Sequence, residues 1–190
     1  MLNIVLFGPP GAGKGTQSRK IIDKYSLVHI STGDLFRKHT SENSALGQLA
    51  KRYMDSGDLV PDDVVISMVE DKIRENLNLN GFIFDGFPRT VNQADALDSM
   101  LAKHDLSISG VIALEVPKEE LKSRIKARAK TSGRADDQAD GEINNRIAVY
   151  NNKTAPVAEY YKKQDKFTAV NGVGSVHSIF AFITEKIASF

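Results

Sequence analysis

The chain has 190 residues, of which 41% are hydrophobic, so it is long enough for one domain with insertions and a sizeable core. Its 25 basic and 24 acidic residues leave a formal charge of +1, and we therefore expect neither a nucleic-acid nor a membrane partner. The absence of cysteine excludes disulfides, a thiol nucleophile and a cysteine-ligated zinc site. We expect no targeting or transmembrane segment, and a cytoplasmic protein.

Apolar strand-like runs alternate with helical patterns along the chain. Strands are expected at residues 2–7, 27–30, 81–85, 110–116 and 167–171. Helices are expected at residues 13–25, 45–56, 62–76, 91–104, 118–130, from 142 onward with a break near Pro156, and at 176–188. The polar segment 131–141 is expected to be a loop, and the helices between residues 31 and 80 an insertion. This alternation predicts an α/β fold, in which helices cover both faces of a parallel sheet in three layers.

A glycine-rich turn, GPPGAGKGT at residues 8–16, joins the first expected strand to the first helix. Glycines let backbone N–H groups converge on a phosphate chain, and the helix that follows adds the positive end of its dipole. Lys14 can then reach the β- and γ-phosphates, and the Thr16 hydroxyl a phosphate-bound Mg²⁺. Gly15 stands where the P-loop pattern has serine or threonine, so we take Thr16 as a displaced equivalent. The alternative is an ordinary strand-to-helix turn.

A second polar group is expected where the strand at residues 81–85 ends, because ligands of open α/β sheets bind at the carboxyl ends of strands. Asp85 follows three apolar residues, and we expect it to face Mg²⁺ through water. Gly86 and Pro88 shape the turn, and Arg89 offers a bidentate fork to phosphate. Otherwise Asp85 would be a helix N-cap or the partner of a neighbouring cation.

Arginines gather in the second half of the chain, at Arg124, Arg128, Arg134 and Arg146. In a chain of near-zero net charge, such a group beside a phosphate site suggests neutralisation of a transferring phosphoryl group. The alternative is a solvated helix face, on which these arginines pair with Glu119, Glu120 or Asp136.

Four motifs together make the chain similar to the adenylate kinases, a family of nucleoside monophosphate kinases, over essentially all of its length. They are GPPGAGKGT at 8–16, STGD at 31–34 with Arg37, FIFDGFPR at 82–89 with Gln93, and GRADD at 133–137 with Arg146. The resemblance implies a P-loop core of residues 1–30, 61–127 and 138–190 with five parallel strands. It also implies an AMP-binding insertion at 31–60 and a short mobile lid at 128–137, without the zinc site of some longer lids. A monomer is expected.

The resemblance also implies which residues bind each nucleotide. ATP is expected on Gly11, Ala12, Gly13, Lys14, Gly15 and Thr16, and near Arg124, Arg128 and the loop around Gly174. AMP is expected at Thr32, Arg37, the backbone of Asp58, Leu59 and Val60, at Gly86, Phe87, Pro88, Arg89 and Gln93, with Arg134 and Arg146 bridging both phosphate groups. Because a side-chain amide both donates and accepts, Gln93 is the residue we expect to recognise the adenine. Alternatively, it is a helix-surface glutamine.

The implied reaction is the reversible, Mg²⁺-dependent transfer of a phosphoryl group from ATP to AMP, which gives two ADP. No general base is expected, because a phosphate monoester has a second pKa of about 6 and already presents an oxyanion. The groups expected to offset anion repulsion are Lys14, Arg37, Arg89, Arg124, Arg128, Arg134 and Arg146, with Asp85 at the metal. Closure of the lid and insertion would exclude water.

Three other functions are weighed against this interpretation. A UMP/CMP kinase shares the P-loop and the DGFPR segment at 85–89, but Thr32, Asp34 and Gln93 favour AMP. A P-loop GTPase needs an Asn-Lys-x-Asp segment, whereas NKTA at 152–155 lacks the aspartate. A non-catalytic nucleotide sensor would not need the full set of arginines.

Overall fold

A parallel β-sheet forms the centre of the computed structural model, which describes residues 1–190 except for the side chain of Ala135. Its strands are β1 (Leu2–Phe7), β2 (Val28–Ser31), β3 (Gly81–Asp85), β4 (Gly110–Glu115) and β5 (Phe167–Asn171). They pair in the order β2-β3-β1-β4-β5, and every pair is parallel. The predicted five-stranded parallel sheet is thereby confirmed.

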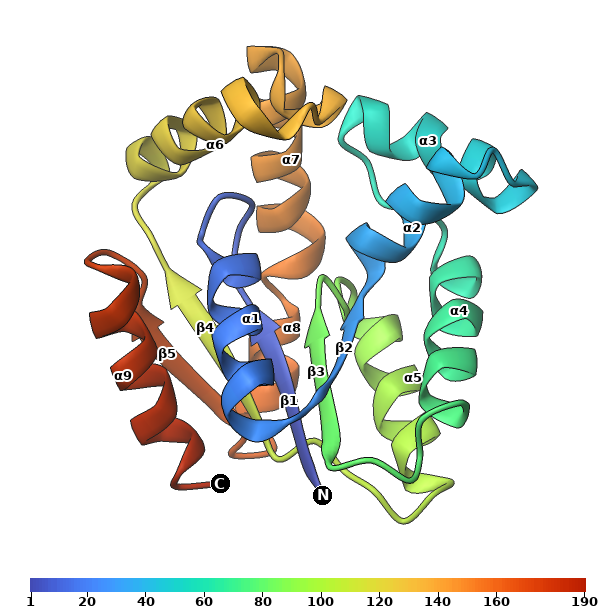
Figure 1. Cartoon of the computed structure of the whole chain (residues 1–190), viewed down its shortest axis with the longest axis vertical. Helices are drawn as coiled ribbons and strands as arrows, with labels where there is room; N and C mark the ends of the chain where they lie inside the picture. The colour runs from blue at the N-terminus through green and yellow to red at the C-terminus, as the bar shows by residue number, and fades with distance from the viewer.

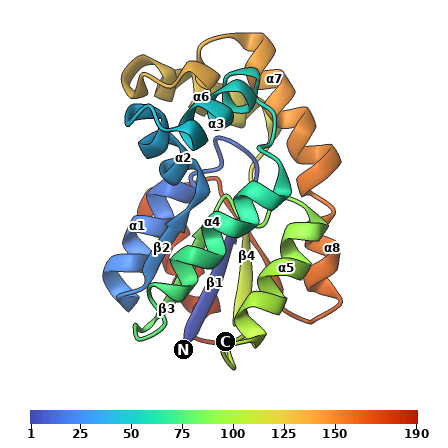
Figure 2. The same cartoon turned by 90° about the vertical axis from the view of Figure 1, so that its right-hand side faces the viewer.

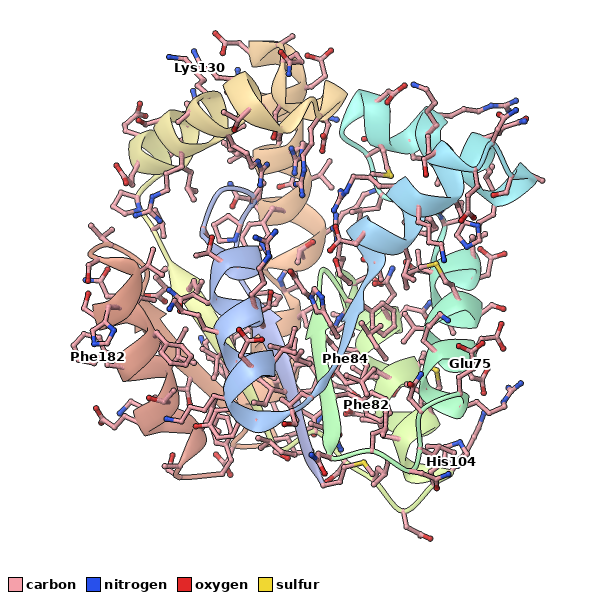
Figure 3. All side chains as sticks on the ribbon, viewed as in Figure 1. Glu75, Phe82, Phe84, His104, Lys130 and Phe182 are labelled. Atoms are coloured by element: carbon pink, nitrogen blue, oxygen red, sulfur yellow. The ribbon has the colours of Figure 1, made fainter. Side chains whose placement is uncertain are left out.

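Helices cover both faces of this sheet (Figures 1 and 2). One face carries α1 (Lys14–Tyr25) and α9 (Val176–Ile187), and the other α4 (Asp62–Arg74), α5 (Val91–Ala102) and α8 (Val157–Lys162). Because strand side chains alternate, Ile4 and Leu6 pack with the α1 and α9 layer, whereas Val5 and Phe7 pack with the opposite layer. Figure 3 shows Phe84 of β3 inside the molecule and Phe182 on the outer side of α9.

The remaining elements lie beyond the carboxyl ends of the strands (Figure 1). After β2 come α2 (Thr32–Ser41) and α3 (Ala45–Ser56), and after β4 come α6 (Lys118–Ser132), the 3₁₀ turn η1 (Ala135–Asp137), α7 (Asp140–Val149) and the π-helical turn η2 (Tyr150–Thr154). These two groups of helices face each other across the top of the sheet. No helix in the described part of the chain is long and apolar enough to cross a membrane.

Two segments differ from the sequence-based expectation. Residues 32–41 form a helix that was not predicted, and the Ser31 hydroxyl caps it by accepting a bond from the Asp34 N–H at 3.3 Å. The predicted loop at 131–141 is largely structured, because α6 continues to Ser132 and ends at Gly133, whose φ of 61° is left-handed. The break predicted near Pro156 is confirmed, since η2 ends at Thr154 and α8 begins at Val157.

Candidate active site

A cavity of about 530 Å³ opens at the carboxyl ends of the central strands. The strand register aligns Leu6 and Ser31 with Asp85, so the ends of β1, β2 and β3 meet at one edge. The cavity walls come from the turn between β1 and α1, from α2, from the turn between β3 and α5, and from α6 and α7. Its volume lies within the usual range for ligand sites, about 300–1,000 Å³.

The glycine-rich turn has the backbone geometry of a phosphate cradle. Gly11 and Gly13 adopt φ angles of 84° and 96°, and Gly13 is the residue directly before α1. A Cβ on Gly11 would lie 2.9 Å from the carbonyl oxygen of Leu121, so the turn packs closely against α6. Ala12 of this turn is buried, its N–H donates to the Pro9 carbonyl at 3.2 Å, and it is not among the residues that line the cavity.

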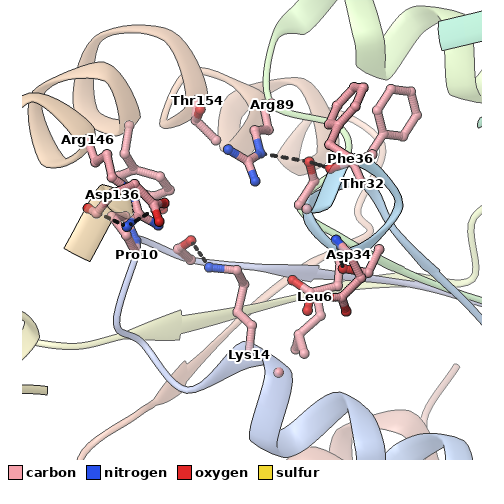
Figure 4. A pocket seen from close by; sticks show the side chains of 18 of the residues that line it. Leu6, Pro10, Lys14, Thr32, Asp34, Phe36, Arg89, Asp136, Arg146 and Thr154 are labelled. Atoms are coloured by element: carbon pink, nitrogen blue, oxygen red, sulfur yellow. Dashed lines mark hydrogen bonds and ion pairs between the residues drawn. The ribbon is translucent and has the colours of Figure 1, made fainter. Parts of the chain in front are cut away.

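Lys14 points into the cavity from the first turn of α1 (Figure 4). Its Nζ donates to the carbonyl oxygens of Gly8 and Pro9 at 2.7 and 3.0 Å. Burial lowers the pKa of Lys14 to about 8; Asp85 raises it, and Arg89, ahead of Arg146 and Arg128, lowers it further. A phosphate anion beside Lys14 would relieve this crowding of positive charge.

Asp85 ends β3 with a carboxylate that is only 14% exposed. Burial acts to raise its pKa, but His29 and Lys14 outweigh this effect and hold the pKa below its usual value. The Nε2 atom of His29 lies 3.9 Å from the Asp85 Oδ2 and has no hydrogen-bond partner in the described part of the chain. Asp85 is therefore ionised at neutral pH.

The cavity also has the oxygen ligands that Mg²⁺ prefers. The Thr16 hydroxyl and the Asp85 carboxylate both line it. No group of three or more acidic, histidine or cysteine side chains among the described residues could hold a metal ion alone. These two oxygens therefore fit a cation that phosphates and water mainly coordinate.

On the opposite side of the cavity, the turn after β3 positions Arg89. The Gly86 carbonyl accepts from the Thr32 hydroxyl and from the Arg89 Nε, both at 2.8 Å. Gly86 has a φ of 75°, and a Cβ there would lie 2.8 Å from the Arg89 Nη2. Burial lowers the pKa of Arg89 to about 10, and Arg146 lowers it further. Arg89 makes no ion pair with any described carboxylate, so its guanidinium is available to an anion.

Two further predicted acceptor residues line the same side of the cavity. Arg37 pairs with Asp34 one turn earlier on α2. Gln93 is 1% exposed, which excludes the alternative of a helix-surface glutamine. Its Oε1 accepts from the backbone N–H of Arg89, and its Nε2 donates to Asp62, both at 2.7 Å.

A buried carboxylate joins two of the predicted phosphate-binding arginines. Asp137 is 0% exposed, and its two oxygens accept from the Nε and Nη2 of Arg128 at 2.7 Å each and from the Nη1 of Arg146 at 2.6 Å. Burial acts to raise the pKa of Asp137, but the bond and charge of Arg128, then Arg146, hold it below its usual value. Asp136 also pairs with Arg146, at 2.9 Å.

The other two arginines of the group reach the cavity from α6 and from the segment that follows it. Arg124 donates to Glu120 at 2.7 Å and to the Gly172 carbonyl at 3.0 Å. Burial lowers the pKa of Arg134, and Arg37 and Arg128 add to the effect. The ion pairs considered as an alternative thus exist at Glu120 and Asp136, yet all four arginines still line the cavity.

The structure brings nearly all of the predicted site residues to this one cavity. The predicted residues that line it are Gly11, Gly13, Lys14, Gly15, Thr16, Thr32, Arg37, Asp58, Leu59, Val60, Asp85, Gly86, Phe87, Pro88, Arg89, Gln93, Arg124, Arg128, Arg134 and Arg146. Ala12 and Gly174 are not among its lining residues, and Arg124 contacts Gly172 instead of Gly174.

Sequence reasoning assigned no role to several residues that line or support the cavity. They include Arg19, His29, Tyr150, Thr154 and the buried Asp137. Two of them have a local signal. Asp137 lies in the same motif as Arg134, and His29 lies on the strand that ends at Ser31.

The P-loop follows the first strand of a parallel sheet and faces a cavity lined with arginines. This arrangement is that of a P-loop phosphotransferase. The family model for adenylate kinase matches residues 6–166. The chain is 52% identical to an adenylate kinase of Flavobacterium psychrophilum over 98% of both chains. It is 46% identical to an adenylate kinase of Bacteroides fragilis, again over 98% of both chains. The chain belongs to the adenylate kinase family, and it is accordingly an ATP:AMP phosphotransferase that interconverts ATP and AMP with two ADP.

A more distant relative differs in length. The chain is 40% identical to an adenylate kinase of Clostridium perfringens over 99% of both chains, in an alignment of 214 positions. Since this chain has 190 residues, the clostridial protein carries additional residues within the matched region.

Proposed function

We propose that this cavity holds ATP and AMP together, with the ATP phosphates on the glycine-rich turn and AMP between α2 and the turn after β3. The observation that carries the proposal is the meeting of Lys14 and Arg89 in one cavity, both with lowered pKa values and neither paired directly with a described carboxylate. Cations crowded in this way favour binding of anionic phosphates, which restore their charge and satisfy their donors.

The transfer then needs alignment and charge neutralisation more than proton transfer. An oxygen of the AMP phosphate forms a bond to the γ-phosphorus of ATP while the bond from this phosphorus to the β,γ-bridging oxygen breaks. The remainder of ATP leaves as one ADP, and AMP becomes the second ADP. No proton has to move, because the AMP oxygen is already ionised near neutral pH. Lys14, Arg89 and Arg146 stabilise the negative charge that spreads over the oxygens of the transferring group.

Mg²⁺ bound to ATP would supply further neutralisation of the β- and γ-phosphates. In this chain Thr16 and Asp85 would hold it, the carboxylate through water. Asp85 is suited to this role because its pKa lies below its usual value, so it keeps its negative charge near neutral pH.

The helices beyond the sheet edge would keep water away from the reacting group. Asn145 of α7 donates to the Ser56 carbonyl at 2.8 Å and to Asp58 at 3.1 Å, so α7 contacts the end of α3 across the cavity. We assign residues 31–60 as the AMP-binding insertion and 128–137, the segment that precedes α7, as the lid. Since the proposed groups all come from one chain, the enzyme would act as a monomer.

A coupled assay of ATP and AMP turnover tests the proposal through Lys14→Met. We expect turnover to fall by more than a hundredfold while the fold is retained, because an oriented charge at the transferring group is worth several kcal/mol. Lys24→Met is the matched control, since Lys24 is exposed on the same helix and its ammonium lies over Tyr25 and Phe180. A Lys14→Met enzyme within tenfold of wild type would contradict the assignment.

A further inference from the structure

Asp62 joins the start of α4 to the start of α5, two helices that lie side by side (Figure 1). Its Oδ1 accepts from the Gln93 Nε2 at 2.7 Å, and its Oδ2 accepts from the Thr90 hydroxyl at 2.8 Å and the Asn92 Nδ2 at 3.1 Å. Sequence reasoning gave Asp62 no role, and it does not line the cavity itself.

The partners of Gln93 determine which way its side-chain amide points. An ionised carboxylate only accepts hydrogen bonds, so the Nε2 end must face Asp62. The backbone N–H of Arg89 only donates, so the Oε1 end must face Arg89. A flipped amide would place Oε1 against the carboxylate and Nε2 against the N–H group. Asp62 and the Arg89 N–H together therefore hold the amide of Gln93 in one orientation, and Asp62 is the side chain of the two that can be changed.

Thr90 links the backbone of Gln93 to Asp62. The Thr90 hydroxyl accepts from the Gln93 backbone N–H at 3.1 Å as the cap of α5, so its own hydrogen is directed to Asp62. The side chain and the backbone of Gln93 are thus both tied, directly or through Thr90, to the same carboxylate. Gln93 is buried, so solvent offers no alternative partners.

The oriented amide selects a particular base edge. A primary amide has two N–H donors and two lone pairs on its oxygen. The contacts with Asp62 and Arg89 use one of each, so one donor and one acceptor remain for a ligand. Adenine presents an acceptor at N1 beside its amino donor, which matches this pair. Hypoxanthine has nearly the same shape but presents an N1–H donor beside a carbonyl acceptor, which opposes it.

We propose that Asp62 is a positioning residue that fixes the amide orientation of Gln93 and so makes the acceptor site prefer an aminopurine to an oxopurine of the same size. This inference rests on the proposed AMP site. Its direct measure is the ratio of kcat/KM for AMP to kcat/KM for IMP, with ATP as the donor.

Asp62→Asn tests the inference because it keeps the shape but offers both a donor and an acceptor to Gln93. We expect the AMP-to-IMP ratio to fall about tenfold, the equivalent of one oriented hydrogen bond, while the KM for ATP is unchanged. Asp63→Asn is the matched control, since Asp63 is the next residue on α4, is exposed, and makes the same change of charge. It should leave the ratio as in wild type.

A merely structural role of Asp62 would lower the amount of active enzyme and leave the ratio intact, because the ratio does not depend on how much protein is folded. As a second variant, Asp62→Ala should also lower the ratio, because it removes the acceptor for the Gln93 Nε2. In a Gln93→Ala background, Asp62→Asn should have no further effect on the ratio.

The possible outcomes separate this inference from the proposed function. A wild-type enzyme that fails to phosphorylate AMP would overturn the proposed function. A wild-type enzyme that prefers AMP, together with an Asp62→Asn variant whose ratio stays within twofold, would overturn only the role of Asp62.

Discussion

Asp137 offers a quantitative test of how the arginines of the cavity are held. It is fully buried and accepts two bonds from Arg128 and one from Arg146, whose side chains are 33% and 17% exposed. Removing one member of a buried ion pair costs about 3–5 kcal/mol, because the other charge is left without compensation. Since both arginines reach solvent and asparagine retains one acceptor, we expect Asp137→Asn to cost about 3 kcal/mol.

Thermal unfolding measures this cost. For a chain of this length, about 3 kcal/mol corresponds to a fall in Tm of about 6–12 °C. The control is Asp140→Asn, because Asp140 is 72% exposed and pairs with Lys126 at 2.8 Å on the surface. That variant should lose much less stability, because water screens an exposed ion pair. Equal losses in the two variants would refute the argument that burial makes the Asp137 interactions strong.

The difference in Tm between wild type and Asp137→Asn should depend on pH in one direction. The pKa of Asp137 is lower in the folded protein than in the unfolded chain, where it is about 3.9. The stabilisation is therefore fully present above about pH 4 and is lost as the pH falls through the folded pKa. We expect the Tm difference between wild type and Asp137→Asn to be constant near neutral pH and to shrink in acid. A difference that grows in acid would contradict this.

Two predictions concern the nucleotides directly. Because Lys14 must keep its proton to bind phosphate and its pKa in the free protein is about 8, we expect kcat/KM for ATP to fall as the pH rises above this value. The kcat should resist the rise in pH, since bound phosphate raises the pKa of Lys14; a flat kcat/KM profile to pH 10 would contradict the prediction. Gln93→Leu should raise the KM for AMP more than the KM for ATP in the coupled assay. An equal increase of both would refute the role of Gln93 in base recognition.

Much of the fold could be predicted because its determinants are local. Apolar runs such as residues 81–85 have few alternatives to a buried strand. Pro156 separates two helical segments because proline lacks the backbone N–H that a continuous helix needs. The helix at 32–41 was missed because its first residues belong to a motif that was interpreted for its chemistry alone. Segment 131–141 is polar, and its order depends on the contacts of Asp137 with Arg128 and Arg146, which flank the segment on α6 and α7; composition does not reveal these contacts.

The sequence predicted which residues form the site, but not the hydrogen bonds that hold them in place. The glycines, Lys14 and Arg89 were identifiable from residue type and spacing, and Gln93 from the resemblance to the adenylate kinases. The sequence does not show that Gln93 is held by Asp62, because the two lie 31 positions apart and on different helices. Ala12 was included as part of a motif, yet the chain turns its N–H inward to Pro9.

The central claim is that one cavity brings ATP and AMP together for direct transfer. It is tested most directly by following nucleotides during reaction of the purified protein with Mg²⁺, ATP and each of AMP, CMP, UMP and GMP. The account predicts that two ADP appear for each ATP and AMP consumed, and that AMP is the best acceptor. Release of inorganic phosphate at a rate independent of AMP, or a preference for CMP or UMP, would contradict it.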